Sequence, residues 1–312
     1  MKAIQIHGYG SNDVLKINIG ASQPTTKKGQ VLVQVYAASI NPVDWKLRAG
    51  YLKDWMPLQF PATMGGDVAG VVTQIGEGVI EYTIGDAIYG SAIVLNGGSG
   101  AFAQFAAVNV ANSAPKPTSL SFEEAASLPL VGTSAVQALE DHIHLNVGQK
   151  ILIHGGAGGI GTIAIQIAKA MGGYVATTVN SDDKDCVKSL GADVVIDYKT
   201  SSFETELSGY DAVFDTVGGE VTNTSFTVLK PGGVLVSMMD QPNVDLAKKY
   251  GVQAIGQNTL VDRNHLQRLA QLVEENKIKA QIDKIYSLDD IQAAFVQQEN
   301  QHPRGKVVIR IK

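Results

Sequence analysis

The pattern of apolar and polar positions changes character near residue 122. Before that point, short segments such as VLVQVYAASI (31–40) and DVAGVVTQIG (67–76) alternate apolar and polar residues, and Gly, Pro, Asn and Asp separate them. Alternation with a period of two is typical of half-buried strands joined by turns. The first part of the chain is therefore predicted to be a twisted, mostly antiparallel β domain.

After residue 122, apolar strands alternate with stretches that have helical spacing. Helices are predicted over 159–171, near 182–190 and over 220–229. The strands that surround them are KILIHG (150–155), YVATTV (174–179), DVVIDY (193–198), YDAVFDTVG (210–218) and GGVLVSMM (232–239). This order predicts βαβ units and a parallel sheet, and thus an α/β fold.

The pattern changes a third time near the end of the chain. Residues 264–278 carry apolar side chains at helical intervals, 287–300 form a second predicted helix opened by Ser287, and 305–311 (GKVVIRI) read as a strand. We expect these elements to return to the first domain. The predicted domains are therefore 1–122 with 263–312, and 123–262.

Length, composition and charge narrow the class of protein. A chain of 312 residues with 45% hydrophobic content can bury two cores. Its net charge of -5 and scattered lysines provide no basic stripe, which argues against nucleic-acid binding. A single cysteine, Cys186, rules out an internal disulfide and a multi-cysteine zinc site. The alternating start (MKAIQIHGYG) is unlike a signal peptide, and no apolar run reaches about 18 residues, so we expect a cytoplasmic protein without a membrane partner.

A glycine-rich turn joins the first strand of the α/β region to its first helix. Gly156, Gly158 and Gly161 fit G-x-G-x-x-G: the first permits a tight turn, the second lets backbone approach a pyrophosphate, and the third lets the helix pack on the strand. The following helix N-terminus would offer unpaired N–H groups to the phosphates. A simple turn without a ligand is the alternative. The predicted dinucleotide-binding segment is Gly156, Ala157, Gly158, Gly159, Ile160 and Gly161.

The end of the second strand of this region indicates which dinucleotide binds. NAD sites usually place Asp or Glu there to bind the ribose 2′-OH, whereas this chain has Asn180 and Ser181, with Lys184 one turn later. Ser181 can donate to a 2′-phosphate and Lys184 can neutralise it, which favours NADPH. Alternatively, Ser181 or Asp182 only caps the next helix and Lys184 is solvated. Asp182 and Asp183 would oppose a phosphate if they pointed inward.

Several segments, in order, carry a family resemblance over nearly the whole chain. They are INPVDWKLRAG (40–50), PATMGGDVAGVV (61–72), SLPLVGTSAVQAL (127–139), HGGAGGIG (154–161), FDTVGG (214–219), LKPGGVLV (229–236) and RGKVVI (304–309). With them, the chain resembles the zinc-free medium-chain dehydrogenases/reductases of the quinone oxidoreductase group. The resemblance implies a GroES-like β-rich substrate domain, a Rossmann domain, a cofactor cleft between them, and NADPH-dependent reduction of quinones or α,β-unsaturated carbonyls.

Two other functions stay open on the sequence alone. The chain could be an NADPH-binding protein of structural or regulatory role with weak turnover, or a zinc-type alcohol dehydrogenase. Zinc-dependent relatives carry a Cys near 41–44, a Gly-His-Glu triplet, a later Cys and a four-cysteine lobe. Here the triplet reads Gly65, Gly66, Asp67, and the lone Cys186 cannot rebuild the site, because a catalytic zinc needs three protein ligands. No metal is therefore expected. Without a Lewis acid, an activated acceptor such as a quinone or enone is the easier substrate.

The resemblance also implies where catalysis takes place. Asn41 matches the family's residue at the nicotinamide end, Asp44 follows it, and Lys46 and Tyr51 are candidate donors to a carbonyl oxygen. Several relatives have a tyrosine where this chain has Lys46. Thr133 resembles the threonine beside the nicotinamide and ribose. Asn41 before Pro42 could instead only initiate a turn, and Asp44 could only cap a short helix.

Two further expectations concern the adenosine end and the assembly. Tyr198 resembles the tyrosine that packs near the 2′-phosphate, although an aromatic residue at a strand end is often only core. Residues 251–261 (GVQAIGQNTLV) read as a strand near the edge of the sheet. Relatives pair this strand across a two-fold axis, so we expect a homodimer.

Overall fold

Residues 1–312 form two compact units in the computed structural model. The first contains Met1–Thr133, Val261–Glu274 and Ala280–Lys312, and the second contains Ser134–Leu260 with Glu275–Lys279. The late elements in Val261–Glu274 and Ala280–Lys312 thus lie in the first unit. Helix α2 (Phe122–Ala126) packs on strands of the first unit, so the chain leaves that unit at residue 133, later than the predicted boundary at 122.

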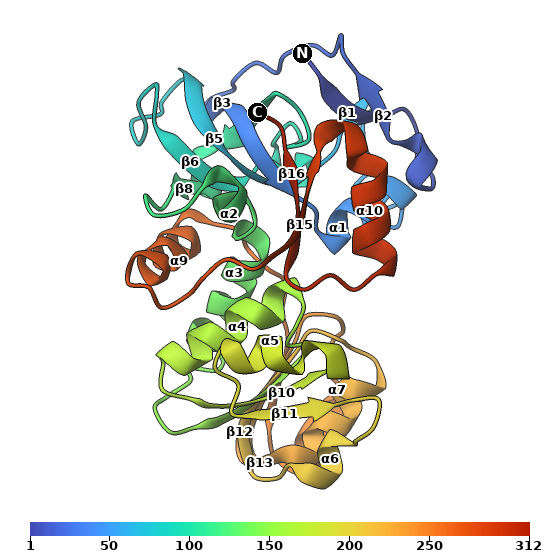
Figure 1. The fold of residues 1–312 in the computed structure, drawn as a ribbon, viewed down its shortest axis with the longest axis vertical. Helices are drawn as coiled ribbons and strands as arrows, with labels where there is room; N and C mark the ends of the chain where they lie inside the picture. Colours follow the sequence, from blue (N-terminus) through green and yellow to red (C-terminus); the bar gives the residue numbers. More distant parts are fainter. The chain divides into compact units, whose positions relative to one another are not determined.

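The first unit is built on two β-sheets that place the site described below. The larger sheet is antiparallel apart from its outermost pair, in the order β15 (Ile282–Ser287), β16 (Lys306–Arg310), β3 (Gln30–Ser39), β5 (Asp67–Ile75), β6 (Ala87–Ser91) and β8 (Ser113–Pro115), with β7 (Phe105–Asn109) also paired to β3. The smaller one has the order β2 (Lys16–Asn18), β1 (Ala3–Ile6), β4 (Ala62–Thr63). Figure 1 shows the last strand, β16, beside the early strand β3.

Four more helices begin in the first unit: α1 (Pro42–Ala49), α3 (Pro129–Val136), α9 (Arg263–Glu274) and α10 (Ile291–Asn300). The second predicted late helix starts with a short 3-10 turn, so α10 begins at Ile291 rather than at Ser287. Its Phe295 packs edge-on against Phe102 in the apolar core of this unit. The C-terminal segment is therefore fixed to the N-terminal sheet by burial of aromatic surface.

The second unit is a six-stranded, all-parallel sheet. Its order is β11 (Val194–Asp197), β10 (Tyr174–Val179), β9 (Lys150–His154), β12 (Tyr210–Asp215), β13 (Leu229–Ser237), β14 (Gln253–Gly256). The helices are α4 (Gly159–Ala170), α5 (Lys184–Ser189), α6 (Phe203–Glu206), α7 (Glu220–Ser225) and α8 (Val244–Tyr250). Beyond Ser225 the predicted helix 220–229 tightens into a 3-10 turn and then enters β13. The predicted α/β fold, a GroES-like β-rich unit plus a doubly wound parallel sheet, is confirmed (Figure 1).

Strand order in the second unit reverses beside β9, and alternate residues face opposite layers. Leu152 and Val213 pack in one cluster with α8, whereas their neighbours Ile151 and Ile153 are equally buried outside that cluster. Burial on both faces is the requirement of a parallel sheet. Ligands of such sheets bind at the carboxyl ends of the strands where the order reverses.

None of the helices combines the length and the apolar character that crossing a membrane requires.

Candidate functional site

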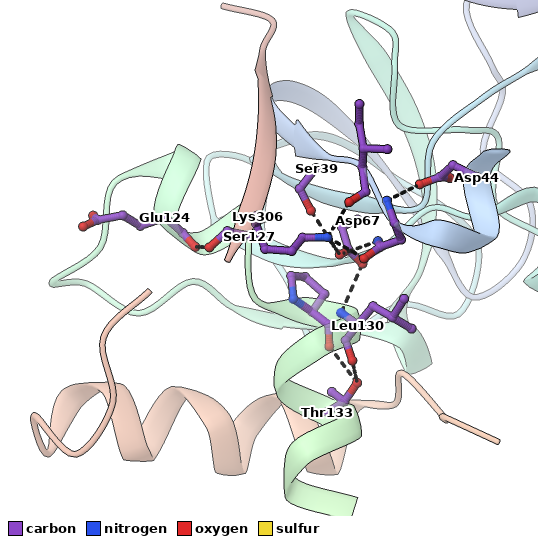
Figure 2. Close-up of polar contacts among 11 residues, drawn as sticks. Ser39, Asp44, Asp67, Glu124, Ser127, Leu130, Thr133 and Lys306 are labelled. Carbon is purple, nitrogen blue, oxygen red and sulfur yellow. Dashed lines mark hydrogen bonds and ion pairs between the residues drawn. The ribbon is translucent and has the colours of Figure 1, made fainter. Parts of the chain in front are cut away.

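A buried carboxylate, Asp67, organises a polar cluster at the start of β5. Its Oδ2 accepts a hydrogen bond from Nδ2 of Asn41 at 2.8 Å and from Oγ of Ser39 at 3.2 Å, and its Oδ1 accepts from the backbone N–H of Leu130 at 3.2 Å (Figure 2). These donors come from Ser39 at the end of β3, from Asn41 at the N-cap of α1, and from Leu130 in α3. Four elements of the first unit therefore meet at this carboxylate, counting β5 itself.

Lys306, the first residue of β16, supplies the positive charge of this cluster. Its ammonium donates to the backbone oxygen of Ile40 at 2.6 Å and to the side-chain oxygen of Asn41, and it lies 3.8 Å from Oδ2 of Asp67. An ammonium only donates and a carboxylate only accepts. The amide of Asn41 is therefore fixed, with its oxygen toward Lys306 and its nitrogen toward Asp67.

Asp44 completes the cluster from the first turn of α1. Its Oδ2 accepts from the backbone N–H of Asn41 at 2.7 Å, whereas its Oδ1 is buried without a hydrogen-bond partner. Asn41 is the N-cap of α1, directly before Pro42. The alternative that these two residues initiate and cap a helix is therefore correct as geometry. Helix capping explains the hydrogen bond between the backbone N–H of Asn41 and Oδ2 of Asp44. It does not explain the hydrogen bonds that the side chain of Asn41 makes to Asp67 and Lys306.

Burial dominates the electrostatics of the cluster. It raises the pKa of Asp44 to about 7; the negative charge of Asp67 adds to the rise, while the N–H of Asn41 and the charge of Lys306 oppose it. Burial also raises the pKa of Asp67 and lowers the pKa of Lys306, while their mutual attraction opposes both shifts. Because several donors converge on Asp67 and only one on Asp44, we assign the ionised carboxylate to Asp67.

The other two predicted catalytic residues lie outside this cluster. Lys46 is on α1, with its ammonium 5.8 Å from the ring centroid of Trp45. Tyr51 follows the helix, is 72% exposed, and packs edge-on against the same Trp45 at 5.5 Å between centroids. The structure thus brings Asn41 and Asp44 together, whereas Lys46 and Tyr51 each lie against Trp45.

Thr133 is fully buried on α3. Its hydroxyl donates to the backbone oxygen of Pro129 at 2.6 Å, one turn earlier in the same helix. The proton of this hydroxyl is therefore used within the helix, and only its oxygen lone pairs remain for a ligand.

The glycine-rich turn has the geometry that a pyrophosphate site needs. A Cβ on Gly156 would lie 2.0 Å from Oγ1 of Thr177, and a Cβ on Gly161 would lie 2.2 Å from the backbone oxygen of Gly155. Both positions therefore require glycine. At Gly158, the N-cap of α4, a Cβ would meet only that same oxygen at 3.4 Å, and no side chain caps the helix. The N–H groups of the first turn of α4, at Gly159, Ile160 and Gly161, therefore have no side-chain cap and can donate hydrogen bonds to phosphate oxygens.

The residues predicted to read the 2′-phosphate follow β10. Asn180 accepts from the N–H of Asp182 and donates to the carboxylate of Asp183, both at 2.8 Å, so it caps the next turn. Asp183 is buried and points toward this amide. Ser181 is exposed beside it. The alternative that Ser181 or Asp182 caps the next helix is therefore wrong, because Asn180 caps the 3-10 turn over 181–183 and Asp183 directly precedes α5.

Lys184 and Tyr198 complete this end of the second unit. The ammonium of Lys184 lies 3.5 Å from Oδ2 of Asp197, the last residue of β11, so it is paired rather than simply solvated. Tyr198, which follows Asp197 in the sequence, is 55% exposed, so its ring is accessible to a ligand. A 2′-phosphate here would have to compete with Asp197 for the ammonium.

The side chains of the first unit do not assemble a zinc-type metal site. Gly66 occupies the middle position of the triplet, and no group of three or more His, Cys, Asp or Glu side chains in the chain could hold a metal ion. Zinc-type relatives have a histidine at the position of Gly66. A Cβ added at Gly66 would point toward Oδ1 of Asp44 and the side chain of Ile93.

Sequence reasoning assigned no role to Asp67, Lys306 or Ser39. A signal was present for the first two, because each is a charged residue at the start of an otherwise apolar strand (DVAGVV and KVVI). Charged side chains are almost never fully buried unless they are paired. Two such positions of opposite charge in one predicted β domain would have suggested the pair.

The comparisons with known proteins agree with this architecture. Residues 27–118 match the family model described as alcohol dehydrogenase GroES-like domain, and residues 190–309 match the one described as zinc-binding dehydrogenase. A chloroplastic quinone-oxidoreductase (QR1) of Triphysaria versicolor is 32% identical over 99% of this chain and 98% of its own. A chloroplastic NADPH-dependent alkenal/one oxidoreductase of Arabidopsis thaliana is 35% identical over 99% of this chain and 79% of its own.

A solved structure extends the agreement to the fold. The quinone oxidoreductase from Coxiella burnetii superposes with a TM-score of 0.92 at 34% identity, covering 100% of this chain and 99% of that one. The order of domains, the parallel sheet with its glycine-rich turn and the near end-to-end matches lead to one assignment. This chain belongs to the medium-chain dehydrogenase/reductase family, in its quinone oxidoreductase group, and is an oxidoreductase with a nicotinamide-dinucleotide-binding fold.

Proposed function

We propose that this protein is a metal-independent, NADPH-dependent reductase that transfers hydride to quinones or α,β-unsaturated carbonyl compounds. The observation that carries the proposal is the uncapped N-terminus of α4 directly after a turn in which Gly156 and Gly161 tolerate no side chain. Such a turn between strand and helix of a parallel sheet is built for a pyrophosphate. The names of the relatives, quinone oxidoreductase and alkenal/one oxidoreductase, support the substrate class.

The residues of this chain have separate tasks in the proposed reaction. Bound NADPH would supply a hydride to an electrophilic carbon of the acceptor. The α4 turn binds the phosphates, and Ser181, Lys184 and Tyr198 bind the adenosine end. By the family resemblance, Asn41 serves the nicotinamide end, where the cluster holds its amide in one orientation.

The oxygen of the acceptor gains negative charge as the hydride arrives. Lys46 and Tyr51 each lie against Trp45, and both carry a polar hydrogen that can stabilise this charge and donate a proton. We therefore retain both as candidate donors. Trp45 gives them a shared apolar support on α1.

The edge strand β14 and the location of the protein complete the proposal. We propose a homodimer in which β14 pairs with β14 of a second copy. We also propose that the protein is cytoplasmic, whereas the relatives include chloroplastic proteins.

The deciding experiment measures initial rates of NADPH and NADH oxidation with chelator-treated protein. The acceptors are one ortho-quinone, one para-quinone, one 2-alkenal and one simple ketone. Turnover with NADPH on a quinone or the alkenal, and little on the ketone, is the expected result. NADPH binding without turnover on any acceptor would contradict the proposal and point to a nucleotide-binding protein instead. Activity only on the ketone, seen in a parallel assay of untreated protein and lost in the chelator-treated protein, would point to metal-dependent chemistry.

A further inference from the structure

The carboxyl group of Asp44 is buried with only one of its oxygens bonded. Oδ2 accepts from the backbone N–H of Asn41, whereas Oδ1 has no partner. An ionised carboxylate in such a place lacks both water and donors, and a buried group of this kind is stabilised by taking up a proton.

The charged groups that face Asp44 come from two strands, Asp67 on β5 and Lys306 on β16. Two carboxyl groups therefore share one ammonium. The ammonium of Lys306 lies 3.8 Å from Asp67, which also accepts three hydrogen bonds from uncharged donors. The electrically neutral state of the cluster has Asp67 ionised, Lys306 protonated and Asp44 carrying a proton.

We propose that Asp44 is a neutral carboxylic acid in the resting protein, with its proton on Oδ1, and that its ionisation is coupled to the charge of the bound nicotinamide ring. The coupling rests on the proposed function, in which Asn41 serves the nicotinamide end. The ring is neutral in NADPH and positive in NADP⁺, so ionised Asp44 beside Asn41 favours NADP⁺. By reciprocity, NADP⁺ favours loss of the proton from Asp44 to solvent. Burial, which raises the pKa of Asp44 to about 7, puts this ionisation in the physiological range.

Substitutions at Gly66 can test for the proposed proton on Oδ1 of Asp44 without changing Asp44 itself. A Cβ at Gly66 would lie 3.9 Å from Oδ1 of Asp44 and 3.6 Å from the nearest atom of Ile93, both ordinary contacts. The hydroxyl of Gly66→Ser can therefore reach Oδ1 and donate to it, which stabilises the ionised form. Gly66→Ala adds the same Cβ without a donor and is the matched control.

The first test is infrared difference spectroscopy of the whole protein between pH 5.5 and 8.5. We expect a carbonyl-stretch band of a protonated carboxylic acid that is lost with a midpoint near pH 7. Asp44→Asn should abolish it, and its amide oxygen can still accept from the N–H of Asn41. Gly66→Ser should lower the midpoint and Gly66→Ala should leave it in place. Absence of such a band, or a band that survives in Asp44→Asn and disappears in Asp67→Asn, overturns the proposal.

The second test measures the affinities of NADP⁺ and NADPH between pH 6 and 8 by calorimetry in two buffers of different ionisation enthalpy. NADP⁺ should release a proton on binding. As pH increases from 6 to 8, the affinity for NADP⁺ should rise by about five-fold or more relative to the affinity for NADPH. Both effects should disappear in Asp44→Asn. An infrared band as expected, together with a pH-independent affinity ratio, overturns the coupling while leaving the acceptor assay to judge the proposed function separately. Failure of both dinucleotides to bind would contradict the proposed function itself.

Discussion

Lys306 donates a hydrogen bond to the side-chain oxygen of Asn41, although 265 residues separate them in the sequence. The same amide donates to Asp67, so one side chain connects a buried cation to a buried anion. Because both partners carry fixed and opposite hydrogen-bonding roles, the amide of Asn41 cannot rotate without losing both bonds. The last strand of the chain thereby holds the residue that the family resemblance puts at the nicotinamide end.

Removal of the cation should destabilise the first unit more than removal of the whole ion pair. Lys306→Met leaves Asp67 charged, buried and without its ammonium, and the expected loss is about 3 to 5 kcal/mol of the free energy of unfolding. Urea denaturation measures it. In the double variant Asp67→Asn, Lys306→Met, both charges are absent, so most of the loss should be recovered. A double variant as unstable as the sum of the two single variants would show that the pair acts through packing instead.

The contribution of Asp44 to stability should fall as pH rises from about 4 to about 7. In this range the unfolded chain ionises Asp44 near its ordinary pKa of 3.8, while the native state still binds the proton because its pKa is about 7. The unfolded state then binds fewer protons than the native state, so the free energy of unfolding decreases with pH and levels off above about 7. The decrease is on the order of a few kcal/mol.

Asp44→Asn is the control for this pH dependence, since it cannot ionise. Its free energy of unfolding, measured by urea denaturation at several pH values, should fall less than that of the original protein between pH 5 and 8. Parallel curves for the two proteins would mean that Asp44 ionises normally in the native state.

Local patterns were sufficient to predict the parallel sheet and its turn. The alternation of strands and helices after residue 122 and the spacing of Gly156, Gly158 and Gly161 are properties of neighbouring residues, so they survive without tertiary information. The C-terminal strand at 306–310 was predicted for the same reason. In each case the signal lies in residues that are close together in the sequence.

The composition of the buried cluster could not be predicted in this way. Asn41, Asp67 and Lys306 meet only because β16 pairs with β3 and β3 pairs with β5. Similarly, Lys184 contacts Asp197 because β10 and β11 are adjacent, with Val179 opposite Asp197. Strand order follows from the whole topology, and a window of sequence does not contain it.

Lys184 should decide between the two nicotinamide cofactors. If it leaves Asp197 to neutralise a 2′-phosphate, Lys184→Ala should raise the KM for NADPH by roughly ten-fold or more and leave the KM for NADH nearly unchanged. Lys188→Ala, an exposed lysine one turn further along α5, is the matched control and should affect neither. Equal effects of Lys184→Ala on both cofactors would indicate that the lysine only supports the fold through Asp197.

The edge of the parallel sheet predicts the oligomeric state. Strand β14 pairs with β13 on one side and has no strand on the other within the chain. An unprotected strand edge favours pairing with a second copy. Light scattering of the purified protein should give twice the chain mass. A value equal to one chain over a wide concentration range would exclude the dimer.

Gly158 and Gly161 should respond differently to the same added methyl group. At Gly161 a Cβ would lie 2.2 Å from the backbone oxygen of Gly155, so Gly161→Ala must shift the turn at Gly155 against α4 and should lower stability as well as dinucleotide binding. At Gly158 the same oxygen lies 3.4 Å from the added Cβ and φ is an ordinary −75°. Gly158→Ala should therefore keep the melting temperature within a few degrees, since its contacts are nearly acceptable.

Binding, however, depends on how closely the backbone at Gly158 can be approached. If the pyrophosphate lies against this residue, the methyl group of Gly158→Ala occupies the approach and should weaken NADPH binding by about ten-fold or more, as measured by fluorescence titration. A variant with unchanged stability and weakened binding separates the ligand from the fold, because only the ligand would contact the new atom. If Gly158→Ala instead binds NADPH normally, the phosphates do not approach the chain at this glycine, and the turn serves the packing of α4 alone.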